Sequence, residues 1–159
     1  LTRISYIGIG VAVREGAPQP NISSGEEFRA AMLNAQSIVY MNPDAGVSSA
    51  VALKQIFDDL GISAEIAARA IILDEGLAAP LVASGDAEIA LQNMTQLVGI
   101  DGITIVGPLP PDIQIQTGYA AAIAAHSTHR DIAAALIAYV TRPAAQTLWI
   151  EAGFEPPTP

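Results

Sequence analysis

The sequence contains no cysteine among its 159 residues. Without a thiol the chain can form neither a disulfide nor a thiolate metal site, and it has no cysteine nucleophile. This absence is compatible with an oxidising compartment but does not by itself indicate one. Histidine is scarce too, with only His126 and His129. The helix-cap residues Ser127 and Thr128 separate them and no third ligand is placed to complete a site, so we expect surface histidines and neither a metal nor another cofactor.

Basic residues are also few, because seven lysines and arginines stand against sixteen acidic residues, which gives a net charge of −9. No basic stripe can hold a phosphate backbone, so we expect no nucleic acid partner. Long apolar runs are missing as well. The longest, at residues 119–125 and 132–140, fall short of the roughly 20 residues that cross a membrane, so we expect no membrane insertion. The chain starts without the pattern of a leader, so secretion is not indicated directly.

What the sequence does contain is apolar residues, at 51%, with only 14% charged, and this composition indicates a folded domain. Short apolar runs alternate with helical patterns along the chain. This alternation predicts an α/β fold with a mostly parallel sheet and helices on both faces. The strands are expected at 6–13, 37–40, 70–73, 87–92, 103–106 and 113–124, and the helices at 24–35, 49–60, 63–68, 77–83, 128–140 and 143–150.

The segment from Tyr40 to Ser49 joins an expected strand to an expected helix through a turn rich in small polar residues. A loop of this kind places backbone N–H groups at the positive end of a helix, where an anion or a polar small molecule binds well. The alternative is that Ser48 or Ser49 only caps its own helix, which is the commonest use of serine at a helix start. The loop by itself leaves both interpretations open.

Two further loops follow expected strands, at Asp74–Ala78 and at Gln92–Thr95. The carboxyl ends of neighbouring parallel strands meet at one edge of a sheet, where open α/β sheets bind ligands. We therefore expect these two loops and the Asn42–Ser49 loop to converge into one wall of a ligand cleft. Such a wall can bind an oxyanion through N–H and hydroxyl donors, without lysine or arginine.

No motif for catalysis is present. Gly8-Ile9-Gly10 lacks the third glycine of a dinucleotide fingerprint, and no helix begins there, so these glycines better fit a bend or a close backbone approach within a strand. No Gly-x-Ser-x-Gly elbow accompanies the serines. Among the paired carboxylates, only Asp74-Glu75 lies in a loop after a strand, where a binding role and a solvated role are equally open. We therefore predict no catalytic residues.

Four segments, taken in order, resemble a known family, the molybdate-binding-protein-like branch of the type II periplasmic solute-binding proteins. Each segment alone is weak, but their combined order along nearly the whole chain is specific. The segments are Gly-Ile-Gly-Val-Ala-Val-Arg-Glu-Gly-Ala-Pro-Gln-Pro-Asn-Ile at 8–22, Pro-Asp-Ala-Gly at 43–46, Gly-Asp-Ala-Glu-Ile at 85–89 with Gln92, and Val-Gly-Pro-Leu-Pro at 106–110.

The resemblance implies two α/β lobes joined by crossing strands, with the ligand between them. By analogy, residues 11–109 form the second, ligand-binding lobe. Residues 1–10 and 110–159 are then the crossing strands and C-terminal helices that pack on a first lobe, and we expect that first lobe to be absent from this sequence. The returning segment then either repacks on the second lobe or is covered by a partner chain through association or exchange. Because an alanine-rich strand at 119–125 would otherwise leave an exposed edge, we expect a homo-oligomer.

The resemblance also supplies candidate ligand contacts and a physiological role. The contacts are Asp44, Ala45, Gly46, Val47, Ser48, Ser49, Leu77, Ala78, Gln92 and Asn93. Molybdate binders have tyrosine at the position of Asn93, so a different small anion, such as an organic acid, is expected here. The family implies a periplasmic location and delivery of solute to an ABC permease.

Two other functions remain open. One is an isomerase acting on a small carboxylic acid, with Asp74 or Glu75 as base. The other is an oligomeric interaction protein with a vestigial cleft.

Overall fold

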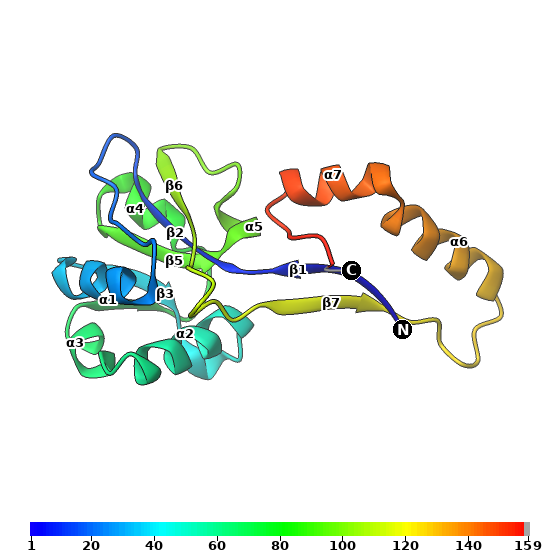
Figure 1. Cartoon of the computed structure of the whole chain (residues 1–159), viewed down its shortest axis with the longest axis horizontal. Coiled ribbons are helices and arrows are strands. Elements are labelled where there is room, and N and C mark those ends of the chain that lie inside the picture. Colours follow the sequence, from blue (N-terminus) through cyan, green and yellow to red (C-terminus); the bar gives the residue numbers. More distant parts are fainter. Residues whose placement is uncertain (158–159) are drawn as a thin grey trace.

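The computed structural model describes residues 1–157, in which a five-stranded sheet of order β4-β3-β5-β2-β6 organises the larger part of the molecule (Figure 1). Its strands are β2 (Ile9–Arg14), β3 (Ile38–Met41), β4 (Ala70–Leu73), β5 (Ile89–Asn93) and β6 (Ile103–Pro108). The helices around it are α1 (Gly25–Asn34), α2 (Ser48–Asp59), α3 (Ser63–Ala67), α4 (Ala79–Ser84) and α5 (Met94–Leu97), with a short 3-10 helix η1 (Pro43–Ala45) before α2.

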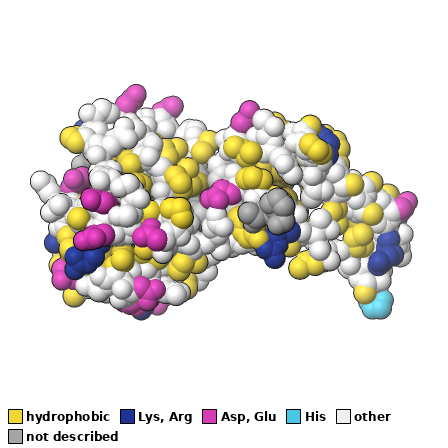
Figure 2. Space-filling model, in the orientation of Figure 1, with side chains coloured by type: hydrophobic (Ala, Val, Ile, Leu, Met, Phe, Trp, Pro, Cys, Tyr) yellow, Lys and Arg dark blue, Asp and Glu magenta, His cyan; other side chains and the backbone are white. Residues whose placement is uncertain are grey.

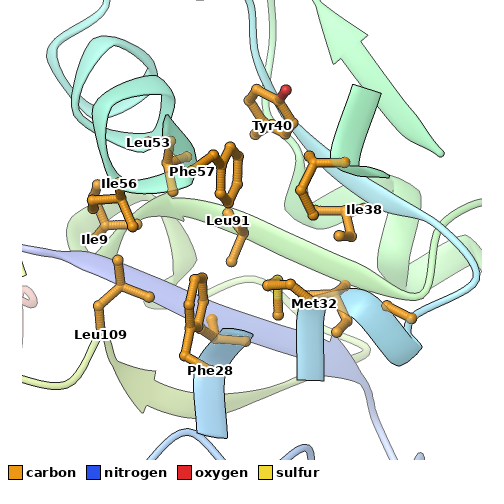
Figure 3. Packing of buried hydrophobic residues seen from close by; sticks show 14 of the residues in the cluster. Ile9, Phe28, Met32, Ile38, Tyr40, Leu53, Ile56, Phe57, Leu91 and Leu109 are labelled. Carbon is orange, nitrogen blue, oxygen red and sulfur yellow. The ribbon is translucent and has the colours of Figure 1, made fainter. Parts of the chain in front are cut away.

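Helices cover both faces of this sheet, because side chains alternate between the faces along each strand. Helices α1, α2 and α3 bury their apolar stripes on one face, where Phe28, Leu53 and Ile66 are nearly inaccessible to solvent. Figure 3 shows Phe28 and Met32 of α1 pointing toward the strands, with Leu53 and Phe57 of α2 beside them. Helices α4 and α5 cover the other face, where Ala79, Val82 and Leu97 are buried in one cluster with the small strand residues Ala12 and Ala90. The predicted α/β fold with helices on both faces is therefore confirmed.

The sheet is mixed, and not purely parallel. Strand β3 runs parallel to β4 and β5, whereas β2 runs antiparallel to β5 and β6. The direction of β2 follows from its entry point, because Ile9 at its start pairs with Asn93 at the end of β5. The start of β2 and the carboxyl ends of β3, β4, β5 and β6 thus share one edge of the sheet.

A second, two-stranded antiparallel sheet leaves from that edge and consists of β1 (Thr2–Ile7) and β7 (Thr117–Ala121). Helices α6 (Arg130–Thr141) and α7 (Pro143–Glu151) follow it and lie away from the five-stranded sheet (Figure 1). We call β1, β7, α6 and α7 the arm. Near its end the chain returns to β1, where Tyr6 and Glu155 exchange backbone hydrogen bonds, each 2.8 Å long.

Three sequence-based expectations need correction. The strand expected at 6–13 is divided at Gly8 into β1 and β2, which belong to different sheets. The long strand expected at 113–124 is wrong, because the N–H groups of Ile113 and Gln114 both bond to the carbonyl of Pro110 and form a turn, so β7 spans only Thr117–Ala121. Helix α5 follows β5 directly, where we expected a loop.

The helix boundaries agree better with the sequence. Ser24 caps α1, and its hydroxyl accepts a hydrogen bond from the N–H of Glu27 at 3.2 Å, as the Ser-x-x-Glu pattern predicts. Gly85 ends α4 with a left-handed backbone, φ 88°. No helix within residues 1–157 has the length and apolarity that a membrane span requires.

Charge is distributed unevenly between the sheet and the arm. Outside residues 9–116 the sequence has three arginines and three acidic residues, so the excess of negative charge lies within residues 9–116. Figure 2 shows most acidic side chains of this face over the part that holds the five-stranded sheet, with apolar side chains spread along the arm. The arm is therefore a nearly neutral, largely apolar extension of an acidic domain.

Candidate functional site

The loop after β3 is built around the side chain of Asn42. Its Oδ1 accepts a hydrogen bond from the N–H of Asp44 at 2.9 Å, which closes the short turn that starts η1. Gly46 then takes a left-handed conformation with φ 73°, which glycine adopts without strain. Val47 is the N-cap of α2, and Ser48 and Ser49 are the first two residues of the helix.

Neither serine caps α2, because the N-cap is Val47, whose side chain has no atom that could accept a hydrogen bond from the helix. The first N–H groups of a helix have no partner within the helix. For Ser48 and Ser49 no backbone or side-chain acceptor is found among residues 1–157. Ser48 is exposed, whereas Ser49 is 3% exposed. The capping alternative is therefore wrong, and the start of α2 presents free N–H donors.

The second predicted loop, after β4, is tied directly to the first. The N–H of Asn42 donates to the carbonyl of Leu73 at 2.8 Å, and its Nδ2 donates to Oδ1 of Asp74, also at 2.8 Å. Asn42 therefore fixes the start of the Asp74–Ala78 loop against the loop that leads into α2.

The third predicted loop, after β5, is tied to the second. The side chain of Gln92 is fully buried, and its Oε1 accepts from the N–H of Ala78 at 3.0 Å. Its Nε2 has no partner within the described part of the chain. Asn93 follows at the N-cap of α5 without a side-chain capping bond. Hydrogen bonds thus link the first loop to the second, and the second to the end of β5, at one sheet edge. The convergence is as predicted, but β5 passes directly into α5 where the third loop was expected.

The electrostatics of this edge are unusual for an anion site. The loops 42–49, 74–78 and 92–95 contain no lysine or arginine, and they carry Asp44, Asp74 and Glu75. The nearest candidate cation on α2 is Lys54, whose ammonium group forms a 2.8 Å ion pair with Asp58. Any negative charge bound here must therefore be stabilised mainly by N–H and amide donors.

A cavity of about 310 Å³ lies beside the first loop. The hydrogen bond and charge of Asp58 raise the pKa of Lys54, and the same bond, with one from Ser63, lowers the pKa of Asp58. Burial raises the pKa of the Tyr40 phenol above its ordinary value. The sequence does not reveal that Tyr40 and Lys54 share this cavity, because they lie on different elements. The lining residues are Tyr40, Asn42, Pro43, Asp44, Lys54, Phe57, Asp58, Ser63 and Ile72.

The arrangement can bind a small polar molecule. Residues 1–157 contain no group of three or more histidine, aspartate or glutamate side chains placed to hold a metal ion. His126 and His129 lie in the segment that connects β7 to α6, outside the loops of the sheet edge. Asp74 is exposed at the edge, with its carboxylate hydrogen-bonded to Asn42.

Comparisons with known proteins show which proteins this chain is similar to. A family model described as bacterial extracellular solute-binding protein matches residues 2–155. An aconitate isomerase from a Pseudomonas species is 30% identical over 148 residues, which covers 93% of this chain and 55% of the relative. The chain therefore spans about half the length of this curated relative.

Solved structures agree at the level of the fold. A chain described as the substrate binding domain of a molybdenum ABC transporter from Clostridium difficile superposes with a TM-score of 0.83 at 12% identity, covering 98% of this chain and 66% of that one. The periplasmic molybdate-binding protein of Azotobacter vinelandii gives 0.62 at 20% identity, with 99% of this chain and 69% of that one covered. The tungstate-binding protein of Desulfovibrio alaskensis gives 0.64 at 13%, with 99% and 70% covered.

Proposed function

Because the chain belongs to the bacterial extracellular solute-binding protein family, we propose that it binds a small anion, an organic acid in particular, at the edge formed by its three loops. The observation that carries the proposal is the start of α2, where the N–H groups of Ser48 and Ser49 have no acceptor within the described residues. The hydrogen bonds of Asn42 and Gln92 hold the neighbouring loops around it. The contacts are then Asp44, Ala45, Gly46, Val47, Ser48, Ser49, Leu77, Ala78, Gln92 and Asn93.

An organic acid is favoured over molybdate by two observations. The relative that is 30% identical is named for aconitate, a carboxylic acid, whereas the molybdate- and tungstate-named structures described above are 12–20% identical. Asn93 also stands where the resemblance to molybdate binders calls for tyrosine. An amide both donates and accepts, which suits a carboxylate with a neighbouring hydroxyl or protonated carboxyl group better than a bare oxyanion.

The domain organisation and cellular role are part of the same proposal. Residues 11–109 form the ligand-binding lobe. The crossing strands and helices that pack against another lobe or chain are formed by residues 1–10 and 110–159. Residues 158–159 lie outside the described residues. The protein acts outside the cytoplasm, in the periplasm, and delivers its ligand to an ABC permease.

Calorimetric titration tests the ligand class. The purified chain is titrated with molybdate, tungstate and sulfate, and in parallel with citrate, malate and the two aconitate isomers. We expect saturable binding of at least one carboxylic acid and a weaker affinity for it after Ser48→Ala or Ser49→Ala. Ser127→Ala, in the arm, is the matched control and leaves the affinity unchanged. Binding of molybdate alone, or of none of these ligands, would contradict the proposal, whereas equal affinity in all variants would exclude the two serine hydroxyls as contacts and leave the backbone N–H groups to be tested.

The aconitate isomerase relative favours a second candidate, an isomerase acting on a small carboxylic acid. Such a reaction removes a proton from one carbon of the acid and returns a proton to another, so it needs a base at the ligand. Asp74 or Glu75 would be that base, and both are exposed in the loop after β4. Incubation of each aconitate isomer in deuterated water, followed by NMR, detects the exchange. The candidate requires deuterium incorporation that disappears in Asp74→Asn or Glu75→Gln, and absence of incorporation rejects it.

We further propose that the arm is covered by a second copy of the chain. Helix α6 contains no buried residue, and Ile132, Leu136 and Tyr139 are 61–63% exposed along one of its faces. Apolar surface of this kind on a monomer marks an interaction site. The arm has equal numbers of arginines and acidic residues, so two arms can meet while the acidic sheet domains stay apart. A vestigial cleft serving only such an oligomer is the third candidate, and the titration above distinguishes it by finding no ligand.

A further inference from the structure

Strand β2 loses its regular neighbour at the point where it begins. Strand β6 ends at Pro108, and Pro110 and Pro111 follow, which have no N–H to donate. On this side of β2 the carbonyl of Ile9 still accepts from the N–H of Leu109 at 2.9 Å. The N–H of Ile9, however, must find its acceptor outside the sheet, because a buried backbone donor is rarely left unpaired.

The side chain of Gln114 supplies that acceptor. Its Oε1 accepts from the N–H of Ile9 at 3.0 Å, and its Nε2 donates to the carbonyl of Ile9 at 2.8 Å. One side-chain amide therefore makes both bonds that a neighbouring strand residue would make in an antiparallel pair. The turn closed by Pro110 holds Gln114 in place, because the Gln114 N–H bonds to the Pro110 carbonyl at 2.9 Å.

Gly8 leaves the space for this contact. A Cβ atom at position 8 would lie 2.7 Å from Nε2 of Gln114 and 3.2 Å from a carboxylate oxygen of Glu155. A side chain at position 8 would therefore displace the amide of Gln114 from its present position. The glycine that divides β1 from β2 is thus also the residue that lets Gln114 reach the backbone.

The residue that Gln114 clamps lies opposite a proposed ligand contact. Ile9 is the pairing partner of Asn93 across β2 and β5, and the adjacent bond runs from the N–H of Met94 to the carbonyl of Gly8 at 3.0 Å. Ile9 and Asn93 are therefore a non-hydrogen-bonded pair, in which side chains approach closely. The backbone of Ile9 therefore lies next to that of Asn93 at the end of β5.

We propose that Gln114 is a positioning residue that holds Ile9 in place and thereby fixes Asn93 for the ligand. This inference rests on the proposed binding function, but its geometric part does not require a ligand. Gln114 also lies on the segment that leads into β7, so its amide is one of the links between the crossing segment and the start of β2.

The test compares Gln114→Leu with Gln116→Leu. Gln116 lies two residues along the same segment and bonds only to the carboxylate of Glu155. We expect Gln114→Leu to shift the side-chain amide NMR signals of Asn93 in the ligand-free protein, and to weaken binding of the best carboxylic acid about tenfold. Gln116→Leu leaves both unchanged. Unshifted Asn93 signals in Gln114→Leu, or equal shifts in both variants, would overturn the inference even if the wild type binds no acid.

A conservative variant with a pH readout separates positioning from general destabilisation. In Gln114→Glu the introduced carboxylate accepts from the N–H of Ile9 but, when ionised, cannot donate to its carbonyl. Protonation restores the donor, so the Asn93 signals return toward their wild-type positions, and any affinity returns toward that of wild type, as the pH falls through the pKa of the introduced carboxyl group. Glu155 is a second carboxylate at Gly8, so the same comparison is also made in a Glu155→Gln background. An Asn93 difference from wild type that stays constant across this titration would contradict a positioning role.

Discussion

The side-chain amide of Asn42 connects two loops of the sheet edge, donating from Nδ2 to the carboxylate of Asp74 at 2.8 Å while its Oδ1 accepts from the N–H of Asp44 at 2.9 Å. Both ends of one amide are thus used, which fixes its orientation. The bond to Asp74 also ties the loop after β4 to the loop before α2.

Asn42→Ala removes both bonds. We expect the loop before α2 to lose its fixed position. The affinity for the bound acid should then fall about tenfold, because the net free energy of roughly one hydrogen bond is lost. Calorimetric titration measures the affinity, with Asn34→Ala as control, because Asn34 is exposed at the end of α1. Equal affinity in the two variants would show that the Asn42 bridge does not shape the site.

Phe28→Ala tests the packing that supports the sheet edge. Phe28 is 0% exposed between α1 and the strands (Figure 3). Removing it leaves a cavity and should lower the free energy of unfolding by about 3–5 kcal/mol. Val51→Ala, at an exposed position of α2, should change it by less than about 0.5 kcal/mol. Urea unfolding of the two variants measures the difference, and similar losses would contradict the packing of Phe28 against the sheet.

The Lys54–Asp58 pair on α2 predicts a pH dependence. Asp58 has a lowered pKa because Lys54 and Ser63 donate to it, so its contribution to stability is present above the ordinary aspartate pKa, about 3.9, and is lost as the pH falls through the lowered value. We expect Lys54→Met to move the Asp58 pKa upward in an NMR titration, and Asp58→Asn to move the Lys54 pKa downward. A pKa of Asp58 that does not change in Lys54→Met would refute the pairing.

Leu136→Glu tests the arm as an interface. Leu136 is 61% exposed, so the charge can be accommodated in a monomer but not between two arms. We expect sedimentation to show a wild-type oligomer and a Leu136→Glu monomer at the same micromolar concentration. Glu26→Leu on α1 of the sheet domain is the control and leaves the wild-type state unchanged. A monomeric wild type would reject the homo-oligomer.

In the five-stranded sheet and its helices, the features that depend on residues close together in the sequence were predicted well. The Ser24-x-x-Glu27 cap, the left-handed Gly85 and the apolar stripes of α1 and α2 all appear where the patterns place them. The convergence of three loops was also predictable, because it needs only the order of the elements and parallel β3, β4 and β5.

Features that depend on contacts between distant residues could not be predicted in the same way. The antiparallel direction of β2 follows from its pairing with β5, about eighty residues later in the chain. The clamp of Gln114 on Ile9 joins residues 105 positions apart, and the turn at Pro110 that places it replaced an expected strand. Ser48 and Ser49 match a capping pattern equally well, and only the backbone geometry shows that they do not cap.

The most direct test of the central claim, that free N–H groups at the start of α2 bind the ligand, is the affinity of Ser48→Pro compared with Ser48→Ala. Ser48 is the first residue of α2, where proline is well accepted, and the extended Val47 before it (ψ 126°) is compatible with a following proline. The proline variant therefore keeps the helix and deletes one N–H, whereas the alanine variant keeps the N–H and deletes the hydroxyl. We predict that Ser48→Pro weakens binding of the carboxylic acid about ten- to a hundredfold, and more than Ser48→Ala does, at unchanged helix content. Wild-type affinity in a folded Ser48→Pro protein would contradict the claim.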